Sequence, residues 1–182
     1  MSNLIRKDKN YKEWIEDVSR RFRASQIKAA MKVNDEMLRF YWMLGNDLNR
    51  IKDNYDWGSH FYTQISKDIQ KQLPDIKSFS PRNLLYMHQF YRLYPNALIT
   101  PQVGAQLKVG EITPQVDAQL EGNNWTAIFN IPWGHHKLIM DKCKDDQKKA
   151  LFFVNKTLEN NWSRAVLLNF LDTDLYDRQG NP

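Results

Sequence analysis

Apolar residues that recur at spacings of three and four predict a long helical region over residues 10–53. An earlier stripe is formed by Trp14, Val18 and Phe22, and a later one by Val33, Met37, Phe40, Leu44, Leu48 and Ile51. The pattern leaves open whether the region is one long helix or two helices that meet near residues 24–26. Turn-forming residues over 53–58 end it.

Two further helices are predicted between residues 60 and 94. The first carries Phe61, Ile65, Ile69 and Leu73 at a spacing of four, and Pro74 ends it. The second begins at Ser80 as the N-cap, with Pro81 in the first helical position, and ends near Tyr94. At about 100° per residue, its apolar face is formed by Leu84, Met87, Tyr91 and Tyr94. The opposite face, expected to point outward, carries Arg82, Tyr86, Gln89 and Leu93, with Asn83 and Arg92 beside it.

This pair of helices has the order of a helix-turn-helix, in which the second helix enters the major groove of DNA. Arg82 would then read guanine, and Asn83 or Gln89 would read adenine. Lys77 and Arg92 would suit phosphates. The connection over residues 73–79 is longer than the turn of the compact motif. The alternative is therefore two packed helices of a bundle, with Arg82 simply exposed.

Residues 99–126 interrupt the helical pattern. The segment 99–107 recurs as 112–120, with eight of nine positions identical. Two copies are too few for a solenoid, which needs at least about three. We expect an inserted loop or a β-hairpin, which would occupy the place of a wing in a winged helix-turn-helix.

Helical patterns resume after Pro132, with helices expected over 134–143 and 145–160. A last helix begins after Ser163, which can cap it as Ser80 caps the earlier one. Ala165 and Val166 stand where Arg82 and Asn83 stand in the earlier unit, so we interpret this last unit as structural. The polar residues 177–182 are interpreted as the start of a linker.

The predicted fold is mainly α, with a helix-turn-helix-like and possibly winged core. Residues 1–98 would form a basic helical region that contains the helix-turn-helix-like unit at 60–94. Residues 99–126 would be the insertion. Residues 127–182 would complete the same domain with further helices.

The charge distribution adds a basic bias to the first half of the chain. Residues 1–98 hold 17 basic and 11 acidic side chains, and the net charge of the whole chain is +5. Part of the excess lies in one segment, formed by Arg20, Arg21, Arg23, Lys28 and Lys32. Such a stripe can follow a phosphate backbone. An ordinary solvated helix face has the same composition, so the charge permits a nucleic-acid partner without requiring one.

Several classes of protein and site are excluded. No apolar run approaches the roughly 18 residues of a membrane span. The single Cys143 and the absence of an apolar signal segment favour a reducing cytoplasmic setting. His135 and His136 are adjacent and point apart on a helix, so with Cys143 they supply too few ligands for zinc. Cys143 is expected at the surface as a free thiol.

No catalytic constellation is present in the sequence. A nuclease needs clustered carboxylates that hold a metal ion, whereas Asp75 and Asp146 lie far apart at the ends of predicted helices. A phosphate-binding Gly-rich loop is also absent. We therefore predict no catalytic residue, no metal and no cofactor for this chain.

Several motifs, in order, resemble the N-terminal domain of the YhcG family. They are Val33-Asn34, Phe40–Gly45, Trp57-Gly58, Phe79–Leu84, Trp133–His136 and Asn161–Arg164. The resemblance covers roughly residues 11–178 apart from the repeat. In that family of bacterial and mobile-element proteins, the domain precedes a PD-(D/E)xK-type nuclease domain. The resemblance implies a DNA-binding role, with the nuclease domain as a partner outside these 182 residues.

Two functions follow as hypotheses. The first is a DNA-binding or targeting module of such a nuclease, with double-stranded DNA as its partner. The residues predicted to contact DNA are Arg82, Asn83, Tyr86, Gln89, Arg92, Lys77, Arg20, Arg21, Arg23 and Lys28. The alternative is a protein-interaction or dimerisation module without DNA contact, because the apolar stripe within residues 27–53 and aromatic side chains such as Tyr41 would suit an interface or a homodimer.

Overall fold

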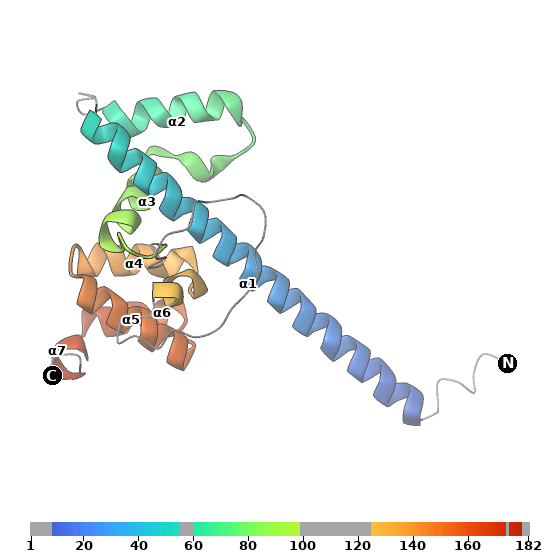
Figure 1. Ribbon diagram of the computed structural model, residues 1–182. Coiled ribbons are helices and arrows are strands. Elements are labelled where there is room, and N and C mark those ends of the chain that lie inside the picture. Colours follow the sequence, from blue (N-terminus) through green and yellow to red (C-terminus); the bar gives the residue numbers. More distant parts are fainter. Residues whose placement is uncertain (1–8, 55–59, 99–124, 174, 180–182) are drawn as a thin grey trace, which may run out of the picture.

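One helix of 46 residues, α1 (Lys9–Asn54), runs past the helical body and projects far beyond it (Figure 1). The computed structural model describes residues 9–54, 60–98, 125–173 and 175–179. Residues 24–26 lie inside the helix, so the region is one helix rather than two. Neither Gly nor Pro occurs at these positions, and nothing there interrupts helical backbone geometry.

The described residues fold entirely into helices and their connections. After α1 these are α2 (Phe61–Gln72), η3 (Lys77–Phe79), α3 (Pro81–Leu93), η4 (Trp125–Asn130), α4 (Trp133–Cys143), α5 (Gln147–Asn160), α6 (Arg164–Asp172) and α7 (Leu175–Gln179). The prediction of a mainly α fold is confirmed, and no strand occurs in these residues. The repeat over 99–120, predicted as a loop or hairpin, lies outside the described residues.

Two boundaries differ from those expected. Trp125 and Thr126, assigned to the insertion, begin the 3₁₀ helix η4. Residues 177–179, assigned to a linker, belong to α7. This short helix is held by packing, because Leu175 is buried and the Tyr176 ring centroid lies 5.3 Å from that of Phe152. These two apolar side chains hold the end of the chain against α5.

Helix α3 lies at the centre of the body, between α1 and α4. Gly45 allows α1 to approach it closely, since a Cβ on this glycine would lie 2.2 Å from the Met87 carbonyl oxygen. On the other side, the Tyr86 hydroxyl donates to the Asp141 carboxylate of α4 at 2.9 Å. The expectation of an outward face on α3 is therefore wrong for Tyr86 and Leu93, which are both buried.

Aromatic rings form the middle of the core. The Phe90 ring meets those of Tyr94, Trp133 and His136 at centroid distances of 5.5, 5.4 and 4.7 Å, all edge-on. Edge-to-face contact suits the charge distribution of aromatic rings. Cys143 also belongs to the core, at 5% exposure, so its expected surface position is wrong. It follows His136 by two helical turns on the buried face of α4, and burial raises its pKa to about 12.

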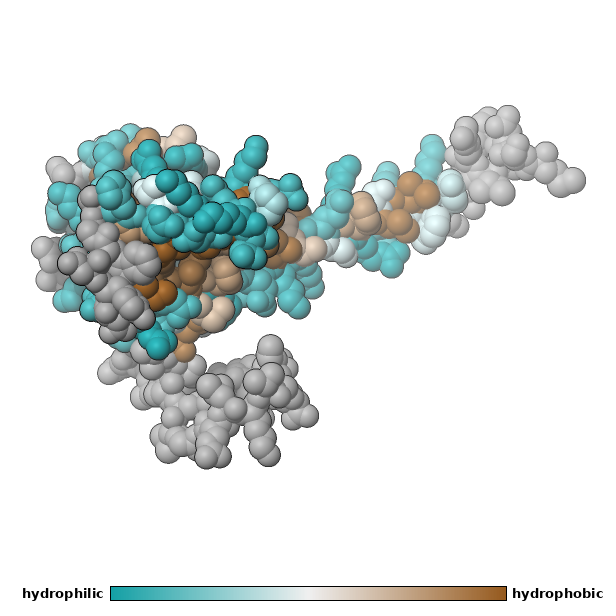
Figure 2. All heavy atoms as spheres, turned by 90° about the horizontal axis from the view of Figure 1, so that it is seen from above, coloured by the Kyte–Doolittle hydropathy of each residue, from teal (hydrophilic) through white to brown (hydrophobic). Residues whose placement is uncertain are grey.

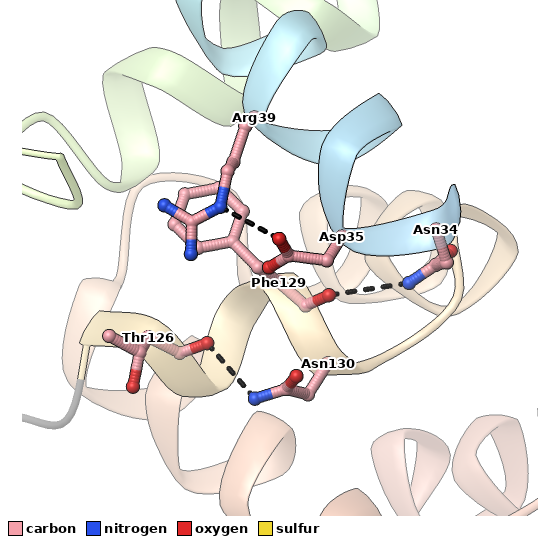
Figure 3. Close-up of polar contacts among 6 residues, drawn as sticks. All are labelled: Asn34, Asp35, Arg39, Thr126, Phe129 and Asn130. Atoms are coloured by element: carbon pink, nitrogen blue, oxygen red, sulfur yellow. Dashed lines mark hydrogen bonds and ion pairs between the residues drawn. The ribbon is translucent and has the colours of Figure 1, made fainter. Parts of the chain in front are cut away.

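Helix α1 is attached to η4 by a short set of polar contacts (Figure 3). The Asn34 side-chain amide donates to the carbonyl oxygens of Phe129 and Ile131, each at 3.3 Å. The Arg39 guanidinium lies 4.4 Å from the Phe129 ring centroid and donates to Asp35 at 2.9 Å. Residues 11–33, on the N-terminal side of this attachment, are all exposed except for half-buried Asp17.

Burial of His136 makes the stability of the fold depend on pH. Its Nε2–H donates to the Ile128 carbonyl at 2.6 Å, and burial lowers its pKa to about 4. An unfolded histidine has a pKa near 6.5. The unfolded chain therefore takes up a proton at higher pH than the fold does, so stability is complete above pH 6.5 and falls as the pH drops toward 4.

We expect the free energy of unfolding to fall by about 2 kcal/mol between pH 7 and pH 5 from His136 alone. His88, whose pKa is also lowered to about 4, chiefly by burial, acts in the same direction. Urea unfolding followed by circular dichroism at the two pH values measures the change. Equal stability at pH 7 and pH 5 would contradict the buried, neutral state of His136.

Candidate nucleic-acid interface

Three helices begin side by side on one part of the body. The Trp133 indole N–H, at the start of α4, donates to the Asn83 side-chain oxygen in the first turn of α3 at 2.9 Å. The His135 Nε2–H donates to the Trp162 carbonyl, just before α6, at 2.9 Å. A Cβ on Gly134 would meet the Arg164 side chain at 3.9 Å. The first turn of α4 thus lies beside those of α3 and α6.

The starts of α3 and α6 are capped as expected. The hydroxyls of Ser80 and Ser163 accept from the backbone N–H groups of Asn83 and Val166, each at 3.3 Å. None of the first turns of α3, α4 and α6 contains an acidic residue. Instead, the first turn of α3 contains Arg82 and that of α6 contains Arg164. A cation near the N-terminus of a helix opposes the helix dipole, whereas an anion at the same place is stabilised.

A third cation, Lys137 of α4, completes the group. Its Nζ lies 5.5 Å from the Tyr86 ring centroid, and the Arg82 guanidinium carbon lies 5.8 Å from the same centroid. Such positions over an aromatic face are favourable for cations. Burial and the charges of Arg164 and Arg82 lower the pKa of Lys137, which Asp141 counteracts. We call Arg82, Lys137 and Arg164 the cation cluster.

Ion pairs are one way in which the charge of the cation cluster could be balanced. Within the described ranges, none of its three side chains forms an ion pair at 4.0 Å or less. Arg82 instead donates to the Tyr86 hydroxyl at 3.4 Å. The hydroxyl in turn donates to both carboxylate oxygens of Asp141. The cluster therefore presents three positive charges at the starts of three helices, with no described carboxylate in ion-pair contact and with Asp141 acting on Arg82 and Lys137 only from a distance.

The other predicted residues of α3 are placed differently. Asn83 is engaged inside the protein, because its amide nitrogen donates to the Ser78 carbonyl at 2.6 Å while its oxygen accepts from Trp133. Tyr86 is covered by α4. Neither side chain points outward as expected.

Gln89 and Arg92 are exposed in a separate groove of about 330 Å³ between α3 and α4. Asp141 and Asp145 also line this groove, and the Arg92 guanidinium lies 3.8 Å from the Asp145 carboxylate. The groove thus mixes both signs of charge, which suits a phosphate less well than the cation cluster does. Lys77 is exposed in η3 and forms no ion pair with a described residue.

The basic residues predicted on α1 do not form a single stripe. Arg20 and Arg21 both pair with Asp17. At about 100° per residue, Arg20 and Arg23 lie toward one side of the helix, while Arg21 and Lys28 lie toward another. All four are exposed. Their positive charge is therefore spread around the helix and partly neutralised.

Two members of the cation cluster were missed by sequence reasoning. Arg164 could have been found from the sequence, because it directly follows the cap residue Ser163 and places a cation against the helix dipole. The interpretation of the last helix as purely structural excluded Arg164 from the predicted contacts. Lys137 carried no comparable signal, because it joins the group only when α4 packs beside α3.

Other kinds of site are not seen in the described part of the chain. No group of three or more His, Cys, Asp or Glu side chains is arranged to hold a metal ion there. None of its helices combines the length and the apolar character that crossing a bilayer requires.

Comparison with known protein families matches residues 17–178 to the DUF1016 N-terminal domain. Neither a curated protein nor a solved structure matches the chain significantly. No catalytic domain is identified in the chain. The family match spans all three helices whose starts carry the cation cluster, and it includes most of α1. The chain therefore belongs to the DUF1016 N-terminal domain family, which is the YhcG-family N-terminal domain that its sequence motifs resemble.

Proposed function

We propose that this chain is a DNA-binding module in which the cation cluster holds backbone phosphates of double-stranded DNA. One observation carries the proposal: three cations that form no ion pair with a described residue lie at the starts of three helices. In a full-length protein of the YhcG type, the module would hold DNA for a C-terminal nuclease domain.

Without a bound anion, several interactions of the cation cluster are unfavourable. Arg82 and Arg164 oppose the dipoles of their own helices, and both disfavour the charged form of Lys137. A bound phosphate would attract all three cations and so offset these unfavourable interactions. Arginine matches phosphate through two parallel hydrogen bonds, and helix starts add further attraction for an anion.

The same geometry favours binding to the DNA backbone over recognition of bases. Asn83 and Tyr86, two of the predicted contacts, are engaged within the protein. Phosphate contacts fix the position of a protein on DNA but carry no sequence information directly. We therefore expect this module to supply affinity with little sequence preference.

The proposal predicts salt-dependent binding to a labelled DNA duplex. Three phosphate contacts give a slope of about −2.7 in a plot of log affinity against log salt concentration. Between 50 and 200 mM salt, this slope corresponds to a loss of about 40-fold in affinity. Fluorescence anisotropy measures the binding, and a duplex of the same length and shuffled sequence serves as the control. Absence of binding at 50 mM salt, or binding that salt does not weaken, would overturn the proposal.

A further inference from the structure

Apolar side chains recur along α1 with a period of eleven residues. Starting at Tyr11, positions separated by four, three and four residues repeat to the end of the helix. They are Tyr11, Ile15, Val18, Phe22, Gln26, Ala29, Val33, Met37, Phe40, Leu44, Leu48 and Ile51. Gln26 is the one polar member. A period of eleven corresponds to about 3.67 residues per turn, so these side chains form a nearly straight stripe along the helix.

Most of this stripe is exposed, although it is continuous with the core. Leu38 and Trp42 are buried and lie on another side of α1, whereas the buried Tyr41 borders the stripe. By contrast, Phe22 and Val33 in the stripe are 61% and 63% exposed. Figure 2 shows hydrophobic side chains among hydrophilic ones on the projecting part of α1. The stripe is buried only toward its end, at Leu48.

A projecting helix with an apolar stripe needs a partner for stability. Isolated helices are marginal in water, and helices in proteins gain most of their stability by packing an apolar face. The attachment at Asn34 joins α1 to η4, but residues 11–33 lie beyond it. The stripe over these residues therefore requires a covering surface.

We propose that a second copy of this chain covers the stripe, so that two α1 helices form a coiled coil. A seam with an eleven-residue period is formed by a helix of matching period and length. The longest of the other described helices, α5, has only 14 residues, whereas a second α1 matches over the whole stripe. Full coverage of the exposed apolar stripe side chains in two copies would bury on the order of 1,200 Å², the lower end of stable interfaces.

Gln26 and the charges give this interface two further properties. A single polar residue within an apolar seam fixes the register of a coiled coil, and Gln26 takes that position. Residues 9–33 hold seven basic and three acidic side chains, so two copies of this segment repel each other. Because salt screens repulsion between exposed charges, higher salt should strengthen the pairing of the chains. DNA binding depends on salt in the opposite sense. A failure of the dimer proposal can therefore be distinguished from a failure of the DNA-binding proposal.

The test is the molar mass of the full chain in sedimentation equilibrium, with two variants that each add one negative charge. Phe22→Glu changes the stripe. Ala24→Glu changes the far side of the helix, about 160° away from Phe22 at about 100° per residue. Both positions are exposed, so circular dichroism should show unchanged folding of the helical body.

We expect the wild type and Ala24→Glu to have twice the chain mass of 21.7 kDa at about 50 μM. Phe22→Glu should have the mass of a single chain and still bind DNA through the cation cluster. A single-chain mass for the wild type would overturn the proposal. Equal dimer fractions for Phe22→Glu and Ala24→Glu would also overturn it.

Discussion

Replacing Gly45 with alanine should destabilise the fold by about 3 kcal/mol, near the upper end for overpacked cores. The new Cβ would lie 2.2 Å from the Met87 carbonyl oxygen and 2.8 Å from the Tyr91 Cβ. Backbone atoms cannot rotate away, so α1 and α3 would have to separate. The loss should appear even though alanine favours a helix by about 1 kcal/mol over glycine. Urea unfolding of the variant and the wild type measures it.

Gly134 provides the matched control. A Cβ there meets only the Arg164 side chain at 3.9 Å, which is ordinary van der Waals contact. Gly134→Ala should therefore be neutral or raise the free energy of unfolding by up to about 1 kcal/mol. A Gly45→Ala variant as stable as Gly134→Ala would contradict the close contact of α1 with α3.

The combined variant Arg82→Met, Lys137→Met and Arg164→Met should bind duplex DNA about 100-fold more weakly at low salt, since three charge-assisted contacts are lost. Its stability should change little, because the lost contacts of Arg82 and Lys137 with Tyr86 oppose the repulsion that is relieved. Methionine keeps an apolar stem of similar length, and the change removes the repulsion that lowers the pKa of Lys137. Fluorescence anisotropy measures DNA binding, and urea unfolding of the same samples measures stability.

A second triple variant controls for the loss of net charge. Lys71, Lys148 and Lys156 lie outside the cation cluster, and Lys71 and Lys156 form ion pairs within their own helices. Replacing all three with methionine changes the total charge equally. We expect less than about a 5-fold loss in DNA affinity, since exposed charges act weakly at a distance. Equal losses in both triple variants would show that the cluster has no special role.

Much of the fold could be predicted because helix formation and capping depend on residues close together in the sequence. Ser80 and Ser163 cap their helices because a hydroxyl there satisfies an unpaired backbone N–H, which depends only on nearby residues. The apolar pattern of α1 indicated a helix because the spacing of its apolar residues is also a local property of the sequence. What covers a helix depends on distant residues. Tyr86 has the sequence position of an outward-facing residue, but α4, some fifty positions later in the chain, packs against it.

The candidate site was less predictable for a related reason. Asn83 has the chemistry of a base reader, but a half-buried amide needs partners, and Ser78 and Trp133 supply them. Of the cation cluster, only Arg82 was predicted. Its companions come from α4 and α6, and their proximity is a property of tertiary structure.

The most direct test of the proposed DNA contact compares salt slopes. The log affinity for one DNA duplex is measured against log salt concentration for the wild type and for the variant lacking the cation cluster. If three phosphates bind to Arg82, Lys137 and Arg164, the slope should become less steep by about 2.7 in the variant. Identical slopes would contradict the account, because the DNA phosphates would then contact other residues.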